Sequence, residues 1–296
     1  MRELLAVVLM ASAMACFAAM DTTTKFLAAG VPALMVIWAR NVFQLAVVSA
    51  TLLPRRGRAL LRTRRPGLQL GRAVLLLGTS LTGIVGIRAM PLAEFTAILL
   101  LTPIALTLLA ALGQRERVPT GRWLCVAGGL VGALLVLRPG VLASATIALL
   151  AVAIVAVNTC YQWVTGRLAQ LEDAGTTQFY TGAIGTLLAS LGLPLVWQAL
   201  PGGDWALLAL MGMLGMSGHL LLLQAYGRAS VSQLTPYLYL QLAFATVAGW
   251  IVFSHRPDDW GLAGMALIGA SGVLAAVVQR QGFPVRADRS INKTRQ

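Results

Sequence analysis

Charged residues are scarce in this chain of 296 residues. Only 11% of its residues are Asp, Glu, Lys or Arg, whereas 58% are hydrophobic. Because soluble domains carry about 25% charged residues, this composition excludes an ordinary soluble protein. Apolar stretches of about 20 residues, the length that crosses the hydrocarbon of a bilayer as a helix, recur from one end of the chain to the other. The sequence therefore predicts an all-α integral membrane protein.

Cysteine and histidine are also rare, with three Cys and two His. Cys16, Cys125 and Cys160 lie in separate apolar stretches without the spacing of metal ligands, so we expect them to pack rather than to form disulfides or bind metal. His219 and His255 are too far apart in the sequence to suggest a metal cluster. Since the chain also lacks a Walker-type phosphate loop, we expect no cofactor and no direct coupling to ATP.

Acidic residues are the scarcer charged type: ten Asp and Glu against 23 Lys and Arg give a formal net charge of +13. A basic balance can indicate a nucleic-acid partner, but these cations lie in the short segments between apolar stretches. We expect them to face anionic lipid headgroups, with no nucleic acid bound. The acids are scattered and form no catalytic group at one membrane face, so an integral-membrane enzyme is a remote alternative.

The apolar stretches predict about ten transmembrane helices. Their expected ranges are 3–24, 32–53, 69–87, 91–112, 121–137, 143–165, 175–196, 205–226, 231–253 and 260–279. Nine spans is the alternative count. The first stretch follows Arg2 and contains small residues, as a secretory signal does, but Asp21 to Lys25 lead directly toward the next stretch. We therefore expect the first stretch to remain as a span.

Basic residues are distributed unequally between the two sides that ten spans define. With the N-terminus inside, 18 of the 23 Lys and Arg residues fall in cytoplasmic segments, including Arg55 and Arg72. Four fall on the opposite side, and Arg40 lies within a span. This is the positive-inside pattern, and it predicts that both termini are cytoplasmic.

Several short matches between the two halves of the chain share an offset of 140 positions. They are Leu53-Pro54 with Leu193-Pro194, Arg88-Ala89 with Arg228-Ala229, Gly78 with Gly218, and Gly132 with Gly272. We therefore expect a first five-helix repeat over 1–140, a second over 141–281 and a basic cytoplasmic tail over 282–296. Because five is an odd number, the second repeat is inverted, which in transporters places the solute site between the halves near the midplane. Duplication that serves only to build a stable bundle is the alternative.

A further set of residues carries a resemblance to a known family. It consists of Ala39-Arg40 in the second stretch, Pro91-Leu92-Ala93 opening the fourth, Pro103 within it, Glu116 after it, and Gly128 in the fifth. With the two repeats, these features resemble the EamA family of the drug/metabolite transporter superfamily over almost the full chain. The resemblance implies a multi-pass, ten-helix carrier of the bacterial inner membrane, whose halves surround a central cavity. Members of that family export amino acids or take up riboflavin or S-adenosylmethionine.

Polar side chains recur at helical spacing in the sixth stretch. Asn158, Tyr161, Gln162 and Thr165 follow i, i+3, i+4 and i+7, and Trp163 lies beside this stripe. Such a stripe suits a cavity that orients a solute by hydrogen bonds and stacking. Hydrogen bonding between helices is the alternative role for each of these residues.

The ninth stretch presents a second polar face. Gln233, Tyr237 and Gln241 repeat every four residues beside Pro236, which interrupts the backbone ladder. We expect Tyr237 and Gln241 to line the cavity. Pro103 in the fourth stretch releases a backbone carbonyl in the same way, and either proline is alternatively a simple kink.

Ionisable residues within the apolar stretches require a partner or a function. Arg40 needs an anion, for which Asp21, Glu94 and a carboxylate or phosphate of the solute are the candidates. Asp21 and Lys25 are four residues apart, which favours mutual neutralisation, and Glu94 suits a helix N-terminus. Proton coupling by Asp21 or Glu94 is the alternative. His219, with an ordinary pKa of about 6.5, can handle a proton or a solute, or simply pack.

The function expected from these features is secondary transport of a small organic metabolite by alternating access. Export of amino acids and uptake of riboflavin or S-adenosylmethionine are both open, whereas the repeat symmetry disfavours a channel. The expected partners are the small-molecule solute and membrane lipids. A monomer and a homodimer fit the sequence equally.

Overall fold

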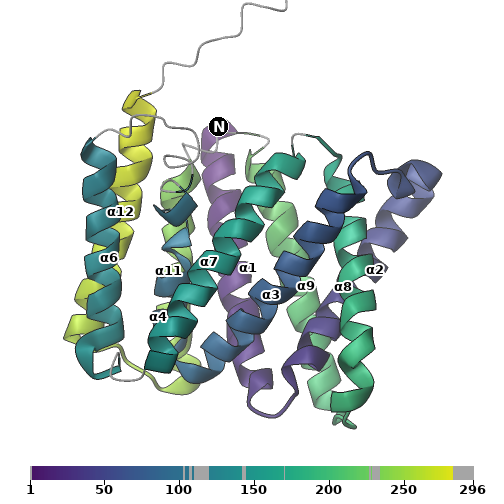
Figure 1. The fold of residues 1–296 in the computed structure, drawn as a ribbon, viewed down its shortest axis with the longest axis horizontal. Coiled ribbons are helices and arrows are strands. Elements are labelled where there is room, and N and C mark those ends of the chain that lie inside the picture. Colours follow the sequence, from purple (N-terminus) through teal and green to yellow (C-terminus); the bar gives the residue numbers. More distant parts are fainter. Residues whose placement is uncertain are drawn as a thin grey trace, which may run out of the picture.

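The computed structural model describes residues 2–102, 104–106, 109, 120–141, 145–169, 171–226, 228 and 234–282. Within that part of the chain the secondary structure consists of helices, with no strand (Figure 1). The elements are α1 (Arg2–Ala28), α2 (Ala33–Arg56), the 3-10 helix η1 (Gly57–Leu61), α3 (Pro66–Ala89), α4 (Leu92–Leu99), α6 (Thr120–Val141), α7 (Ala145–Ala169), α8 (Ala174–Val196), α9 (Gly202–Tyr226), the 3-10 helix η2 (Thr235–Tyr239), α11 (Leu240–Phe253) and α12 (Asp259–Gly282).

Six helices are long and apolar enough to cross a membrane, namely α1, α2, α3, α7, α8 and α9, and shorter apolar stretches lie in α4, α6, α11 and α12. Each span predicted from the sequence overlaps one of these helices. Helix α1 continues to Ala28, beyond its predicted end at 24, and within it the hydroxyls of Thr22, Thr23 and Thr24 donate to carbonyls four residues earlier at 2.7 to 2.8 Å. These bonds satisfy the polar side chains within the helix. The chain is therefore an all-α, multi-pass membrane protein.

Large apolar side chains cover much of the outer surface. Leu195 is 88% exposed, Ile251 74% and Leu191 73%. Soluble monomers rarely expose contiguous apolar surface on this scale, whereas lipid tails solvate it without cost. The outer faces of α8 and α11 are thus suited to hydrocarbon.

Helices from the two halves of the chain pack against each other. The most extensive contacts join α1 with α9, α6 with α12, α2 with α8, and α3 with α7. Figure 1 shows α6 and α12 side by side at one edge, and shows that α1 begins and α12 ends at the same end of the bundle. The interior between residues 2–141 and 145–282 is therefore lined by both halves.

Glycines permit the close approach of α6 and α12. A Cβ atom built on Gly132 would lie 2.8 Å from the carbonyl oxygen of Gly264, and one on Gly264 would lie 2.6 Å from that of Gly132. Small residues at such contacts let membrane helices pack backbone to backbone. Gly128, four residues before Gly132, also contacts α12, where Ser271 lies against it.

Prolines mark the helix ends and the one interruption that the sequence suggests within the described residues. Pro54 and Pro194 lie in the last turns of α2 and α8. Pro236 lies in η2, and the α-helix resumes only at Leu240. The ninth stretch therefore enters the bundle as a 3-10 turn followed by a short α-helix, while Pro103 and Gln233 lie outside the described residues.

Candidate functional site

Two cavities lie between the helices near Arg40 of α2. One, termed the polar cavity, has a volume of about 60 Å³ and contains Arg40, Arg72, Tyr161, Gln178 and His219 in its wall. The other, termed the larger cavity, has a volume of about 160 Å³ and a more apolar wall. Met20, Arg40 and Leu76 line both, so the two spaces adjoin at these side chains.

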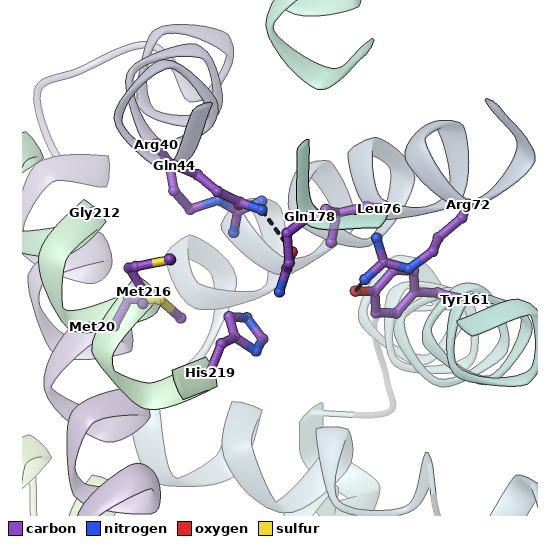
Figure 2. A pocket seen from close by; sticks show the side chains of 11 residues that line it. Met20, Arg40, Gln44, Arg72, Leu76, Tyr161, Gln178, Gly212, Met216 and His219 are labelled. Carbon is purple, nitrogen blue, oxygen red and sulfur yellow. Dashed lines mark hydrogen bonds between the residues drawn. The ribbon is translucent and has the colours of Figure 1, made fainter. Parts of the chain in front are cut away.

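The polar cavity collects side chains from six helices. They are Met20 of α1, Arg40 and Gln44 of α2, Arg72 and Leu76 of α3, Tyr161 of α7, Gln178 of α8, and Gly212, Gly215, Met216 and His219 of α9. Figure 2 shows the Arg40–Gln44 group and the Arg72–Tyr161 pair on either side of Gln178, with His219 facing the same space. Both halves of the chain therefore build this wall.

Arg72 is the most fully enclosed cation of the polar cavity, with 5% of its surface exposed. Its Nε donates to the hydroxyl of Thr165 at 3.0 Å, one terminal nitrogen donates to Tyr161 at 2.9 Å, and the other donates to Thr181. The guanidinium also lies 5.2 Å from the centre of the Tyr161 ring, within cation–π range. These neutral partners fix the orientation of the guanidinium without neutralising its charge.

Arg40 is held less completely than Arg72. A terminal nitrogen of Arg40 donates to the Ser80 hydroxyl at 2.6 Å. One turn along α2, the Gln44 amide donates to the Gln178 side-chain oxygen at 2.8 Å, which joins α2 to α8. No carboxylate lies within ion-pair distance of Arg40 among the described residues.

Asp21 is a buried carboxylate in the wall of the larger cavity, with 8% of its surface exposed. The Gln241 amide donates to it at 3.1 Å. The mutual neutralisation of Asp21 and Lys25 that their spacing favours does not form. Lys25 instead donates to the carbonyls of Ile87 and Met90 at 2.8 and 2.7 Å, because these carbonyls end α3 beside it and lack helical donors.

The polar stripe of α7 divides between the cavities and the outer surface. Asn158 lines the larger cavity and donates to Thr102 at 2.9 Å, and Tyr161 lines the polar cavity. Gln162 and Trp163 are exposed and line neither cavity. Trp163 instead lies under the guanidinium of Arg167, 4.0 Å from the ring centre. Their expected place in the cavity is therefore corrected: both lie on a part of α7 that its main neighbours, α3 and α4, leave uncovered.

The two candidates of the ninth stretch, Tyr237 and Gln241, lie in different surroundings. Tyr237 packs against the apolar cluster around Met10 and Met14 of α1 and lines neither of these two cavities, so its role in a solute cavity stays a prediction. Gln241 is placed beside the larger cavity through its bond to Asp21. A 3-10 helix has about three residues per turn instead of about 3.6, so a spacing of four residues that begins in η2 does not keep Tyr237 and Gln241 on one face.

His219 and Glu94 lie in different surroundings. His219 lines the polar cavity, with an exposed side chain whose ring meets Phe17 edge to face at 5.0 Å. Glu94 begins α4 outside both cavities, 3.7 Å from the Nε2 atom of His255. Glu116 lies outside the described residues.

Three polar residues of the site were not selected from the sequence: Gln44, Arg72 and Gln178. Gln44 is four residues after Arg40, so the i, i+4 spacing was a usable signal. Arg72 belongs to the arginine-rich segment that sequence reading assigns to the cytoplasmic surface. The structure corrects this for Arg72, because α3 already begins at Pro66 and its second turn faces α7 and α8.

Comparisons with known proteins place this chain among carriers of small solutes, although no family model matches it. A riboflavin transporter of Rhizobium johnstonii is 29% identical over 74% of this chain and 73% of the relative. An S-adenosylmethionine uptake transporter of Rickettsia felis is 25% identical over 84% of each chain. A pseudopaline exporter of Pseudomonas aeruginosa is 26% identical over 85% of this chain and 89% of the relative.

A solved structure described as "Crystal structure of protein" has the same fold. It superposes with a TM-score of 0.66 over 93% of this chain and 98% of the other, at 19% sequence identity. At that identity the likeness shows the fold alone.

Proposed function

We propose that this chain is a secondary transporter that moves a small organic metabolite across the bacterial inner membrane by alternating access. The observation that carries the proposal is the polar cavity, whose wall comes from α1, α2 and α3 of the first half and from α7, α8 and α9 of the second. A solute site between two halves is what alternating access requires. The similarity to relatives named as transporters of riboflavin and S-adenosylmethionine supports the same function.

The pairing of the helices supports two inverted repeats, over 1–140 and 141–281. Exchanging the halves in order turns α1, α2 and α3 into α7, α8 and α9. This exchange converts the α1–α9 contact into the α3–α7 contact, and the α2–α9 contact into the α3–α8 contact, and all four occur. It leaves the α2–α8, α4–α11 and α6–α12 pairs unchanged. Such a pattern is expected of halves related by a two-fold axis in the membrane plane, as the resemblance to the EamA family implies.

The two halves are not packed identically in this conformation. Helix α1 packs on α9 more extensively than α3 packs on α7, although the repeat makes these pairs equivalent. A carrier with inverted repeats changes its open face when the halves exchange such arrangements. We take this conformation to be one of the two that alternate, with both termini on the cytoplasmic side.

Solute counterflow in proteoliposomes tests the proposed function. Vesicles containing the full chain are loaded with unlabelled riboflavin, S-adenosylmethionine or an amino-acid mixture, and the labelled form of the same solute is added outside. Counterflow reports both export and uptake carriers, whose names both occur among the relatives. We expect transient accumulation of at least one label above that in protein-free vesicles.

Two arginine variants provide the matched control. Arg40→Ala removes a side chain that lines both cavities, and we expect it to lower counterflow roughly tenfold or more at normal folded yield. Arg62→Ala removes an exposed arginine, and we expect it to leave counterflow unchanged. Failure of every solute to accumulate, or single-channel currents in planar bilayers, would contradict the proposal.

A further inference from the structure

Among the described residues, two arginines and no acidic side chain line the polar cavity. Arg40 and Arg72 are the charged residues of this described wall when His219 is neutral. His219 lies in the same wall as both guanidiniums. Burying a cation away from water without a counter-ion costs several kcal/mol in general. The surroundings of each arginine therefore decide whether the protein itself neutralises this charge.

The described part of the chain does not neutralise Arg72. Its three hydrogen bonds go to the hydroxyls of Thr165, Thr181 and Tyr161, all of them neutral. A guanidinium has five N–H donors, so two remain directed away from this cage. Among the described residues Arg72 forms no ion pair. The hydroxyl cage holds the cation in place and leaves its charge for another partner.

Arg40 also has more hydrogen-bond donors than described partners. Its described hydrogen bond goes to Ser80, which leaves four of five donors. Asp21 lines the larger cavity together with Arg40, but the two form no ion pair among the described residues, and the carboxylate of Asp21 accepts from Gln241 instead. The paired amides of Gln44 and Gln178 lie in the same wall and supply neutral hydrogen-bonding groups beside the two cations (Figure 2).

We infer that the polar cavity binds an anionic group of the transported solute, a carboxylate or a phosphate, through Arg40 and Arg72. Planar guanidinium groups match both oxyanions with paired hydrogen bonds. The adjoining larger cavity, walled by Ile37, Ile84, Phe95 and Ile154 among others, accepts the apolar part of the same solute. This inference rests on the proposed transport function and restricts its substrates to anions or zwitterions.

If Arg72 served only to hold helices together, we would expect it to have different hydrogen-bond partners. Arginines that only tie helices together in a membrane are paired with acids or backbone carbonyls, as Arg88 is with the carbonyls of Ala28 and Val31 at 2.7 Å. Arg72 contacts neither, and it faces a cavity. Because Arg88 on the same helix is paired with backbone carbonyls and Arg72 is not, we place the anionic ligand at Arg72.

Matched pairs of solutes that differ by one charge test the inference. The probes are riboflavin 5′-phosphate against riboflavin, and 3-phenylpropionate against 3-phenylpropionamide. Binding is measured as ligand-dependent thermal stabilisation of the full chain in neutral detergent. We expect the anionic member of each pair to bind at least about tenfold more tightly than the neutral one.

The charge preference, rather than affinity alone, is then compared among variants. We expect Arg72→Gln to bring the ratio within each pair close to one, Arg72→Lys to retain part of it, and Arg62→Gln to leave it unchanged. Should Arg72→Gln fail to fold, Arg40→Gln provides the same ratio from the other cation. These ratios do not move if Arg72 merely supports the fold.

Four outcomes would overturn the inference. The first is equal binding of charged and neutral members by the unsubstituted protein. The second is an unchanged preference in both the Arg72→Gln and the Arg40→Gln proteins. The third is displacement of the anionic probe by phosphatidylglycerol only when Arg72 is present, which would assign the site to a lipid headgroup. Counterflow of neutral riboflavin alone would likewise reject the anion site while leaving the proposed transport function intact.

Discussion

At the scale of single residues, the buried guanidinium of Arg72 depends on three hydroxyl groups from α7 and α8. Thr165 and Tyr161 come from α7, and Thr181 comes from α8. Hydrogen bonds to a charged group contribute about 1.5–3 kcal/mol each, so these neutral side chains stabilise the cation where no acid is present. The same hydroxyls fix the direction in which the free donors point.

Tyr161→Phe removes one of these acceptors while keeping the ring. We expect the free energy of unfolding to fall by about 1–3 kcal/mol, because a buried donor of Arg72 loses its partner. SDS-induced unfolding in mixed micelles, followed by tryptophan fluorescence, measures the change. Tyr180→Phe is the control, since its hydroxyl donates to the carbonyl of Leu61 in an exposed setting. A loss for Tyr180→Phe as large as that for Tyr161→Phe would refute this account of Arg72.

Asp21 is a buried carboxylate in the wall of the larger cavity, and its hydrogen-bond partner is an amide. We predict that Asp21 carries the proton that couples transport to a pH gradient. Asp21→Asn should then retain solute counterflow and lose the response to an imposed gradient. Asp259→Asn, which changes an exposed acid at the start of α12, should retain both. Gradient-driven accumulation by the Asp21→Asn protein would rule out this role.

At the scale of helices, the contact between α6 and α12 is set by glycine. The backbones approach so closely at Gly132 and Gly264 that even a methyl group would meet a carbonyl oxygen. A backbone carbonyl cannot turn aside as a flexible side chain can, so the helices must separate to admit it.

Gly264→Ala should therefore destabilise the protein by about 1–3 kcal/mol through overpacking. Gly269→Ala lies on the same helix and meets nothing within 4 Å, so the higher helix propensity of alanine should leave its stability equal or slightly higher. The same SDS titration measures both. Equal effects of the two substitutions would contradict the close α6–α12 contact.

Helix positions were predictable from the sequence, because apolar length alone identifies a membrane span. The sequence did not predict how much of each polar face is covered by neighbouring helices. Asn158, Tyr161 and Gln162 belong to one stripe of α7, yet Gln162 is exposed, since the packing of α3 and α4 on α7 decides how much of the stripe is covered. Arg72 was missed for a related reason, as a cation near a predicted span edge does not reveal on which side of its helix the bundle lies. The position of Tyr237 could not be predicted, because it depends on the 3-10 helix η2, which the sequence pattern does not reveal.

At the scale of the whole molecule, the cavities lie where helices of both halves meet, and the helix contacts repeat when the halves are exchanged. The basic segments on one predicted side orient such a bundle in the membrane. A carrier built in this way exposes one internal site first to one side of the membrane and then to the other.

The accessibility of one cavity residue from both sides of the membrane tests whether the internal site alternates in this way. Met216→Cys, in a protein whose Cys16, Cys125 and Cys160 are replaced by Ser, places a single thiol in the wall of the polar cavity. Its reaction with a membrane-impermeant maleimide is measured in right-side-out and in inside-out vesicles. We predict labelling from both sides, with a transported solute raising one rate and lowering the other. Labelling from one side only, whether or not solute is present, would contradict alternating access.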